Sequence, residues 1–166
     1  MRKPILVAYA TKHESTQEVA TAIAARMRVR GAEVDVRPAS EVGTLSPYGA
    51  VILGGALYAG RWHRDARRFL ARHREELRQL PLAVFAMGPL KMDPADVEAS
   101  RHQLDRTLAK APDLAPISVR IFGGVIDPAK QRFPFTHMDA ADARDWNAIS
   151  AWAEELVRRF AEPAAA

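Results

Sequence analysis

The chain has 166 residues, 48% of them hydrophobic, which suits one globular domain with a sizeable buried core. It contains no cysteine, which excludes disulfides, thiolate-bound clusters, cysteine zinc sites and thiol catalysis, so redox chemistry would need a bound organic cofactor. The formal net charge is +4, and residues 61–78 alone contribute that excess, with seven arginines against three acidic residues.

The basic segment at residues 61–78 has two readings. It is either a solvated helix face or a docking face for an acidic protein or an anionic membrane. It is too local for a general nucleic-acid binder, so we expect no nucleic-acid partner. The apolar run at residues 5–10 is too short for a signal-peptide core or a membrane span, and we therefore expect a cytoplasmic protein.

Five short apolar runs rich in β-branched residues alternate with stretches of helical spacing. Runs such as AVILGGAL and LAVFAMG are typical of strands that are buried on both faces. The alternation predicts a single α/β domain at residues 1–161, with a parallel sheet between two helix layers, and a disordered tail at residues 162–166. The predicted strands are residues 5–11, 33–38, 50–57, 81–88 and 117–126.

Four helices are predicted around these strands, and a brief helix is expected within residues 40–48. No linker, internal repeat or low-complexity block interrupts the pattern. The positions that mark the four helix faces are Thr16, Val19, Ala20, Ile23 and Met27; Phe69, Leu70, His73, Leu77 and Leu80; Val97, Leu104 and Leu108; and Ile149, Trp152, Leu156 and Phe160.

Three loops are candidates for a ligand site, because parallel sheets bind ligands at the carboxyl ends of their strands, where the strand order reverses. These loops are residues 11–16, 56–62 and 87–92. The first loop is rich in hydroxyl and basic side chains and opens onto a helix N-terminus, whose unpaired amides and dipole suit a phosphate. A simple helix cap by Ser15 or Thr16 is the alternative.

Other cofactor and catalytic motifs are missing from the sequence. It has no G-x-G-x-x-G fingerprint, no Walker loop and no G-x-S-x-G nucleophile elbow. The five histidines show no ligand spacing, so we expect no metal site. They are His13, His63, His73, His102 and His137.

The stretch ILVAYATKHESTQEVA resembles the phosphate loop of the flavodoxin-like FMN-binding proteins. AVILGGALYAG and FAMGPLK resemble the second and third flavin loops, and the likeness extends over nearly the whole chain. Within that superfamily YATKHEST, GGALYAGRWH and VRIFGGVI are most similar to the menaquinone-dependent protoporphyrinogen oxidase branch. The resemblance implies a flavodoxin-like three-layer sandwich with a five-stranded parallel sheet of order 2-1-3-4-5.

The resemblance also implies that FMN is bound by three loops. Tyr58 would stack on the flavin ring, although a tyrosine at a strand end is also a common packing residue. The implied contacts are Thr11, Lys12, His13, Glu14, Ser15 and Thr16 to the phosphate; Ala56, Leu57, Tyr58, Ala59 and Gly60 to one side of the ring; and Met87, Gly88, Pro89 and Lys91 to the other.

Three features depart from the family pattern. Glu14 stands where the family usually has glycine, and its carboxylate would repel the phosphate unless it points to solvent or meets Lys12. Ala59 replaces the glycine whose peptide turns over in flavodoxins proper, which disfavours one-electron shuttling unless Gly60 supplies that turn. The segment at residues 127–146 is shorter than the insertion of the oxidase branch.

Positive charge lies in or beside both predicted ring loops, through Arg61, Arg64 and Lys91. Because cations favour the anionic reduced flavin, we expect an FMN-dependent oxidoreductase that takes two electrons from an organic substrate. A protoporphyrinogen-like compound is a candidate donor, and a quinone or another molecule is the acceptor. The main alternative is an electron-transfer flavodoxin that shuttles electrons between protein partners.

The aromatic segment after the fifth predicted strand has two readings. Phe133, Phe135 and Met138 either form an apolar lip over the flavin, which a quinone at the membrane surface would meet, or cover the core. The first reading adds a peripheral position on the inner face of the membrane.

Two further alternatives have no catalytic role. A signalling receiver domain shares the sheet order, but it needs acids where this chain has Ala10-Thr11 and Gly54-Gly55. A flavodoxin fold that has lost its cofactor would have Glu14 as the damaged position.

Overall fold

A computed structural model describes residues 2–11, 14–126 and 141–162. Five parallel strands form the main sheet in the order β2-β1-β3-β5-β6, and the short strand β4 pairs with β3 in the antiparallel sense. This confirms the predicted α/β sandwich and strand order. The strands are β1 (Ile5–Ala10), β2 (Val34–Pro38), β3 (Ala50–Tyr58), β4 (Arg61–Trp62), β5 (Leu82–Met87) and β6 (Ser118–Phe122).

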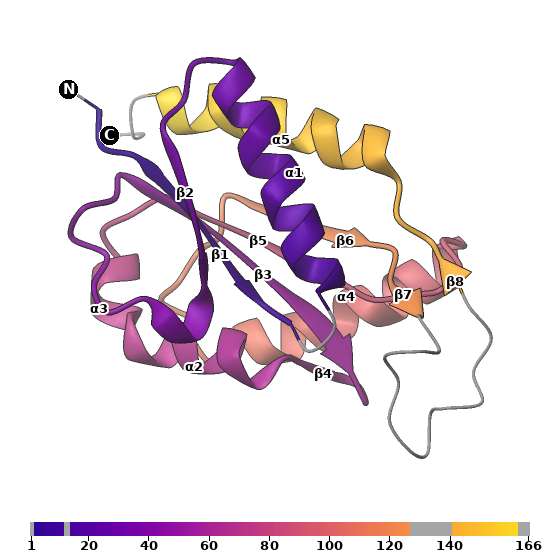
Figure 1. Cartoon of the computed structure of the whole chain (residues 1–166). Coiled ribbons are helices and arrows are strands. Elements are labelled where there is room, and N and C mark those ends of the chain that lie inside the picture. Colours follow the sequence, from indigo (N-terminus) through magenta and orange to yellow (C-terminus); the bar gives the residue numbers. More distant parts are fainter. Residues whose placement is uncertain (1, 12–13, 127–140, 163–166) are drawn as a thin grey trace.

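Helices cover both faces of the sheet (Figure 1). One apolar layer packs α1 (Ser15–Val29) and α5 (Trp146–Ala161) against the sheet. The other layer contains α2 (Arg64–Arg72), α3 (Arg74–Leu77) and α4 (Pro94–Leu108). A 3-10 helix at Ala39–Glu41 overlaps the start of the region where a brief helix was predicted.

The two apolar layers are closely packed on either side of the sheet. On the α1/α5 side, Phe85, Phe122 and Trp152 form an aromatic cluster with ring centroids 5.6 to 5.9 Å apart. The ring of Phe85 lies so close to Gly54 that any Cβ there would overlap it. On the other side Trp62 is fully buried, and its Nε1 donates to the Gly55 carbonyl at 3.0 Å.

Two predicted elements are divided in the structure. The predicted fifth strand stops at Phe122. At the next residue, Gly123, the backbone lies so close to Ala143 that a Cβ on Gly123 would overlap the Ala143 carbonyl. The chain then forms β7 (Val125–Ile126), which pairs antiparallel with β8 (Ala141–Asp142). The predicted second helix is interrupted between α2 and α3 at His73, which is buried with Nε2 3.2 Å from the Val42 carbonyl.

Some predictions fall outside the described residues. These are the apolar lip of Phe133, Phe135 and Met138, the phosphate contacts of Lys12 and His13, and residues 163–166 of the predicted tail. Among the residues that the structure does describe, no helix is long and apolar enough to cross a membrane.

Candidate functional site at the carboxyl end of the sheet

The first loop joins β1 to α1 and leaves the start of that helix without a side-chain cap. Glu14 occupies the N-cap position, where its side chain makes no capping hydrogen bond, and its φ of 65° lies in the left-handed region. The alternative of a helix cap by Ser15 or Thr16 is therefore not the arrangement found, because both residues lie inside α1. A left-handed conformation costs a non-glycine residue about 1–2 kcal/mol.

Thr16 has a buried hydroxyl in the first turn of α1. Its residue is fully buried, and Oγ1 has no hydrogen-bond partner within the described part of the chain. A buried polar atom without a partner is costly, and such atoms are uncommon in folded proteins. The first turn of α1 therefore combines a hydroxyl without a described partner with amides that the Glu14 side chain does not cap.

The second loop is a tight β-hairpin. Leu57 pairs with Trp62, and Tyr58 pairs with Arg61, so Ala59 and Gly60 form a two-residue turn. Both turn residues have positive φ, 51° for Ala59 and 77° for Gly60, as a type I′ hairpin requires. The hairpin holds Tyr58 at the surface, where 43% of the residue is exposed. Ala56 lies just before it, half-buried in β3.

The third loop follows β5 and is held to the end of β6 by main-chain hydrogen bonds. The amide of Gly88 donates to the Phe122 carbonyl at 2.9 Å, and the amide of Gly124 donates to the Pro89 carbonyl at 2.9 Å. Met87 is only 2% exposed and packs in the core. Gly88 and Pro89, by contrast, are half-buried and open to the surface.

The second and third loops meet around an open hollow of about 460 Å³. Predicted site residues from both loops line it, namely Leu57, Gly60, Gly88, Pro89 and Lys91. The α4 helix completes the wall with Asp96, Ser100 and Gln103, which the sequence did not indicate as site residues. Their only signal was the polar face of a helix. Glu14 lies instead in a separate hollow beside Glu18 and Trp146.

Arg144 joins the segment before α5 to the first turn of α1. Its side chain is 9% exposed and donates to Asp142 at 2.8 Å and to Glu18 at 2.9 Å. It also lies over the Trp146 ring, 4.7 Å from the centroid. The hydrogen bond from Arg144 lowers the pKa of the Asp142 carboxyl below its usual value. Sequence analysis did not single out this network, because its members are far apart in the chain.

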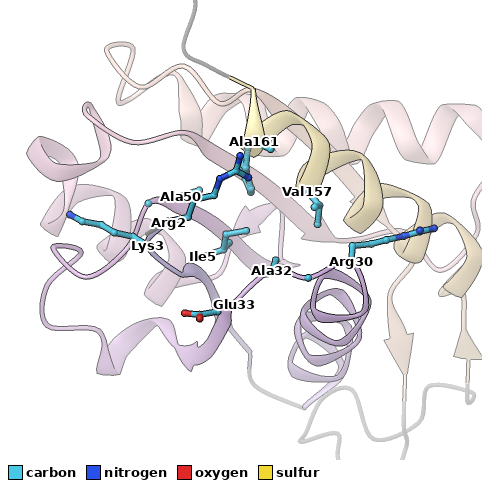
Figure 2. Close-up of a pocket in the computed structure, with 12 residues that line it drawn as sticks. Arg2, Lys3, Ile5, Arg30, Ala32, Glu33, Ala50, Val157 and Ala161 are labelled. Atoms are coloured by element: carbon cyan, nitrogen blue, oxygen red, sulfur yellow. The ribbon is translucent and has the colours of Figure 1, made fainter.

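Another hollow, of about 470 Å³, lies at the amino end of the sheet (Figure 2). Its rim contains several cations, but Lys3 and Arg30 point away from it. Lys3 Nζ donates to the Ser46 carbonyl at 3.1 Å, and Arg30 donates to Glu154 at 2.7 Å. These charges are used in structural contacts, so we do not consider this hollow the functional site. The described residues contain no group of three or more side chains that could hold a metal.

Known proteins were compared with the chain. A family model described as a flavodoxin domain matches residues 6–138. Oxidised flavodoxin 1 from Bacillus cereus superposes with a TM-score of 0.62 at 16% identity, covering 93% of this chain and 97% of that one. The Streptococcus pneumoniae flavodoxin gives 0.58 at 17% identity, covering 93% and 98%.

A larger protein contains a similar domain. Rubredoxin oxygen:oxidoreductase from Desulfovibrio gigas gives a TM-score of 0.60 at 16% identity, covering 96% of this chain but 37% of that one. No curated protein matches the sequence. At these identities the structural likeness establishes the fold alone.

Proposed function

Because the chain belongs to the flavodoxin-domain family, whose cofactor is FMN, we propose that it is an FMN-dependent oxidoreductase that takes two electrons from an organic donor. It then passes these electrons to a separate acceptor. The observation that carries this proposal is the excess of positive charge on and beside the second and third loops, where three cations stand against Asp96 in the wall of the hollow. Arg61 and Arg64 are exposed and form no ion pair with any described residue, and Lys91 lines the hollow itself.

The phosphate of FMN would bind at the first loop, through Thr11, Lys12, His13, Ser15 and Thr16. Two observations support this assignment, namely the unsatisfied Thr16 hydroxyl and the absence of a side-chain cap on α1. A phosphate supplies acceptor oxygens and negative charge, which match a hydroxyl and a helix N-terminus. Glu14 is exposed and lines a separate hollow beside Glu18 and Trp146, so its carboxylate would oppose the phosphate charge only weakly.

The flavin ring would lie between the second and third loops. Its contacts would come from Ala56, Leu57, Tyr58, Ala59 and Gly60 on one side, and from Met87, Gly88, Pro89 and Lys91 on the other. The burial of Met87 limits it to supporting the loop from beneath. FMN supplies the redox chemistry, because it can accept and release electrons singly or in pairs.

The surrounding cations determine which redox state the protein favours. A cation about 8 Å from the ring contributes about 2 kcal/mol at an effective dielectric constant near 20, equivalent to about 0.1 V for one electron. Arg61, Arg64 and Lys91 would therefore favour the more negative, reduced cofactor. Easier reduction suits an enzyme that withdraws electrons from an organic molecule.

The donor and acceptor are finer proposals. The motifs YATKHEST and GGALYAGRWH support a protoporphyrinogen-like donor and a quinone acceptor, by their similarity to the menaquinone-dependent oxidase branch. A cytoplasmic protein, in peripheral contact with the inner face of the membrane, would have access to both. Residues 127–140, which would provide the membrane contact, lie outside the described residues.

Anaerobic reduction of the FMN-loaded protein tests the proposal. Candidate donors, including protoporphyrinogen, are mixed with the protein, and the loss of flavin absorbance is followed; menaquinone and dioxygen are then compared as oxidants. We expect full two-electron reduction by an organic donor and rapid reoxidation by one of the acceptors. A redox titration with two well-separated one-electron steps, the second at very low potential, would contradict the proposal.

The second candidate function is an electron shuttle between proteins. It is favoured by Gly60, which has positive φ and, within the described structure, open space around its Cβ position. A peptide that includes this glycine can turn over without a steric clash, as one-electron carriers of this family require. The same titration separates the two functions, because a shuttle would give the two resolved steps.

Variants at Glu14 test the phosphate assignment separately. Replacing Glu14 with Gln removes the negative charge but keeps the side-chain length; because the residue is exposed and its charge is screened, we expect FMN to bind about two- to threefold more tightly. Calorimetric titration of the apoprotein with FMN measures the change. Glu41→Gln, an exposed change in the 3-10 helix, is the control and should leave the affinity as it is. Equal affinities for the Glu14→Gln variant and the wild type would mean that the phosphate lies elsewhere.

A further inference from the structure

The seven arginines of residues 61–78 divide into two groups in the structure. Three are held by intramolecular contacts: Arg67 donates to the Trp62 carbonyl at 3.0 Å, Arg74 donates to Asp113 at 2.8 Å, and Arg78 donates to Glu75 at 3.1 Å. The other four are exposed and have no hydrogen bond or ion pair to any described residue. They are Arg61, Arg64, Arg68 and Arg72, which we call the arginine strip.

The arginine strip lies on one face of the molecule. Arg64, Arg68 and Arg72 recur every four residues along α2, so their side chains project from the same side of that helix. The opposite side of the helix packs into the core through Ala66, Phe69 and Leu70. Arg61 precedes the helix on β4, opposite Tyr58 in the hairpin.

The strip begins at the hairpin that borders the proposed flavin site. Figure 1 shows α2 following β4 and running back from the carboxyl end of the sheet along its length. From Arg64 to Arg72 the helix rises about 12 Å, at 1.5 Å per residue. A partner that covered this length would therefore have its edge at the hairpin, next to the proposed flavin site.

A hollow of about 520 Å³ runs beside the strip. It lies between α2 and the 3-10 helix at Ala39–Glu41, and its wall includes Arg68, Arg72 and Phe69, with one carboxylate, that of Asp65, against the two arginines. A flat charged helix would attract any anion equally well. A hollow next to the charges offers a place for a protruding side chain, which favours a protein over a lipid surface.

We propose that the arginine strip is the docking face for an acidic redox protein, which exchanges electrons with the FMN at the hairpin. This inference rests on the proposed function and names a protein, in place of a quinone, as its electron acceptor. Carboxylates about 6 Å apart on the partner would match the spacing of the arginines. Acidic residues one helical turn apart, or two residues apart on a strand, have about this spacing. Because the four arginines form no ion pair with a described residue, they can pair with the partner's carboxylates without breaking an ion pair in the described part of the chain.

Charge reversal at the far end of the strip tests the inference. The variant Arg68→Glu with Arg72→Glu leaves Arg61 and Arg64, which lie near the flavin, in place. The control variant, Arg106→Glu with Arg158→Glu, makes the same change in net charge at exposed arginines of α4 and α5. Arg72, Arg106 and Arg158 all lie in the last turns of their helices, so the control reverses two charges at helix C-termini against one in the strip variant and bears at least as large a helix-dipole cost.

Binding is the first readout, with an acidic [2Fe–2S] protein as the probe and the FMN-loaded full chain as its target. In calorimetric titration at about 20 mM salt, we expect the affinity to fall at least tenfold in the strip variant and to be unchanged in the control. Wild-type binding should also weaken steeply as salt rises. Equal affinity of the two variants, or no binding by the wild type at low salt, would overturn the inference.

Electron transfer is the second readout, followed by stopped-flow spectroscopy. The bound flavin is first reduced photochemically; two oxidised probe molecules, chosen with a potential above that of the flavin, then take one electron each, while the proton of the anionic reduced flavin returns to solvent. The second-order rate should fall at least tenfold in the strip variant, while photochemical reduction by a small donor stays at the wild-type rate. If the small donor also fails to reduce the wild-type protein, the proposed function has failed rather than the docking face.

Two other anionic surfaces serve as competing arms. Vesicles with about one third phosphatidylserine test a membrane surface, and a duplex DNA of about 20 base pairs tests a nucleic acid. Strip-dependent binding to either one that is tighter than binding to the acidic protein would assign the strip to that surface and overturn our proposal.

Discussion

At the amino end of the sheet, positive φ falls on a glycine, whereas at the carboxyl end it also falls on two residues that carry side chains. Gly31, in the turn before β2, has a φ of 92°, which glycine adopts freely. At the other end, Glu14 and Ala59 adopt positive φ, and the Thr16 hydroxyl has no partner in the described structure. The carboxyl end is therefore held in a costly arrangement, as functional sites often are.

The largest effect is expected where the carboxyl end is most crowded. Gly123→Ala would drive a methyl group into the Ala143 carbonyl, and main chain cannot move aside cheaply. We expect it to lower the free energy of unfolding by about 3 kcal/mol. Gly43→Ala is the control, because no described atom lies within 4 Å of its Cβ position, and it should be neutral. Urea denaturation measures both, and a stable Gly123→Ala variant would contradict the packing described here.

Ion pairs at the two ends of the sheet should contribute differently to the free energy of unfolding. Arg144→Gln removes a guanidinium that is 9% exposed and leaves Asp142 and Glu18 unmatched, so we expect a loss of about 2 kcal/mol. Arg30→Gln removes one that is 54% exposed, and it should cost about 0.5 kcal/mol or less. Thermal unfolding measured side by side would reveal the difference, and equal losses would remove this contrast between the ends.

The ion pair between Arg144 and Asp142 should make the stability of the protein depend on pH. Because Arg144 lowers the pKa of Asp142 in the folded state, the pair stabilises the protein above the unfolded pKa, near 4. That stabilisation is lost as pH falls through the lower, folded pKa. The stability gap between wild type and the Arg144→Gln variant should therefore narrow below about pH 4, whereas a gap that is constant with pH would point to packing alone.

Buried hydroxyls at the two ends provide a matched pair. Thr16→Val removes the unsatisfied hydroxyl near the carboxyl end and should stabilise the apoprotein by about 1 kcal/mol while weakening FMN binding about tenfold. Ser118→Ala, at the amino end of β6, instead deprives the Trp152 indole of its acceptor at 2.9 Å and should destabilise by about 1 kcal/mol. Thr16→Val with unchanged FMN affinity would argue against a ligand role for this hydroxyl.

The smallest effect is expected in the hairpin. Ala59→Gly relieves a positive φ and should raise the free energy of unfolding by about 0.5 kcal/mol, because the relief exceeds the added freedom of the unfolded chain. Gly60→Ala makes the opposite change at the neighbouring position and should cost about 1 kcal/mol. Chemical denaturation of the two variants and the wild type gives the ranking, and a reversed order would mean that the hairpin adopts a different turn.

Most of the fold could be predicted because its signals are local and repeated. The runs around Val51 and Val84 are apolar at every position, as strands covered on both faces must be, and the spacing from Val19 to Met27 is helical. Each of these signals depends only on neighbouring residues. Four of the five parallel strands were therefore predicted to within one residue of their bounds, the fifth was predicted four residues too long at its end, and all four helical regions were recognised.

The remaining features depend on distant contacts. The apolar spacing continues through His73, and only its bond to the Val42 carbonyl shows why the helix breaks there. Gly123 ends β6 because of Ala143, which follows some 20 residues later. The Ala59-Gly60 hairpin was missed because alanine is not a usual first residue of such a turn. The unsatisfied Thr16 hydroxyl likewise depends on surroundings that no sequence pattern reveals.

Trp62 gives this protein an internal optical probe. Its indole is held rigidly by the Gly55 carbonyl and lies two residues from the hairpin turn, so its fluorescence would be quenched by energy transfer to a flavin bound nearby. Replacing the exposed Trp146 and the buried Trp152 by phenylalanine would leave a single emitter. Cofactor uptake could then be timed in milliseconds without a chemical label.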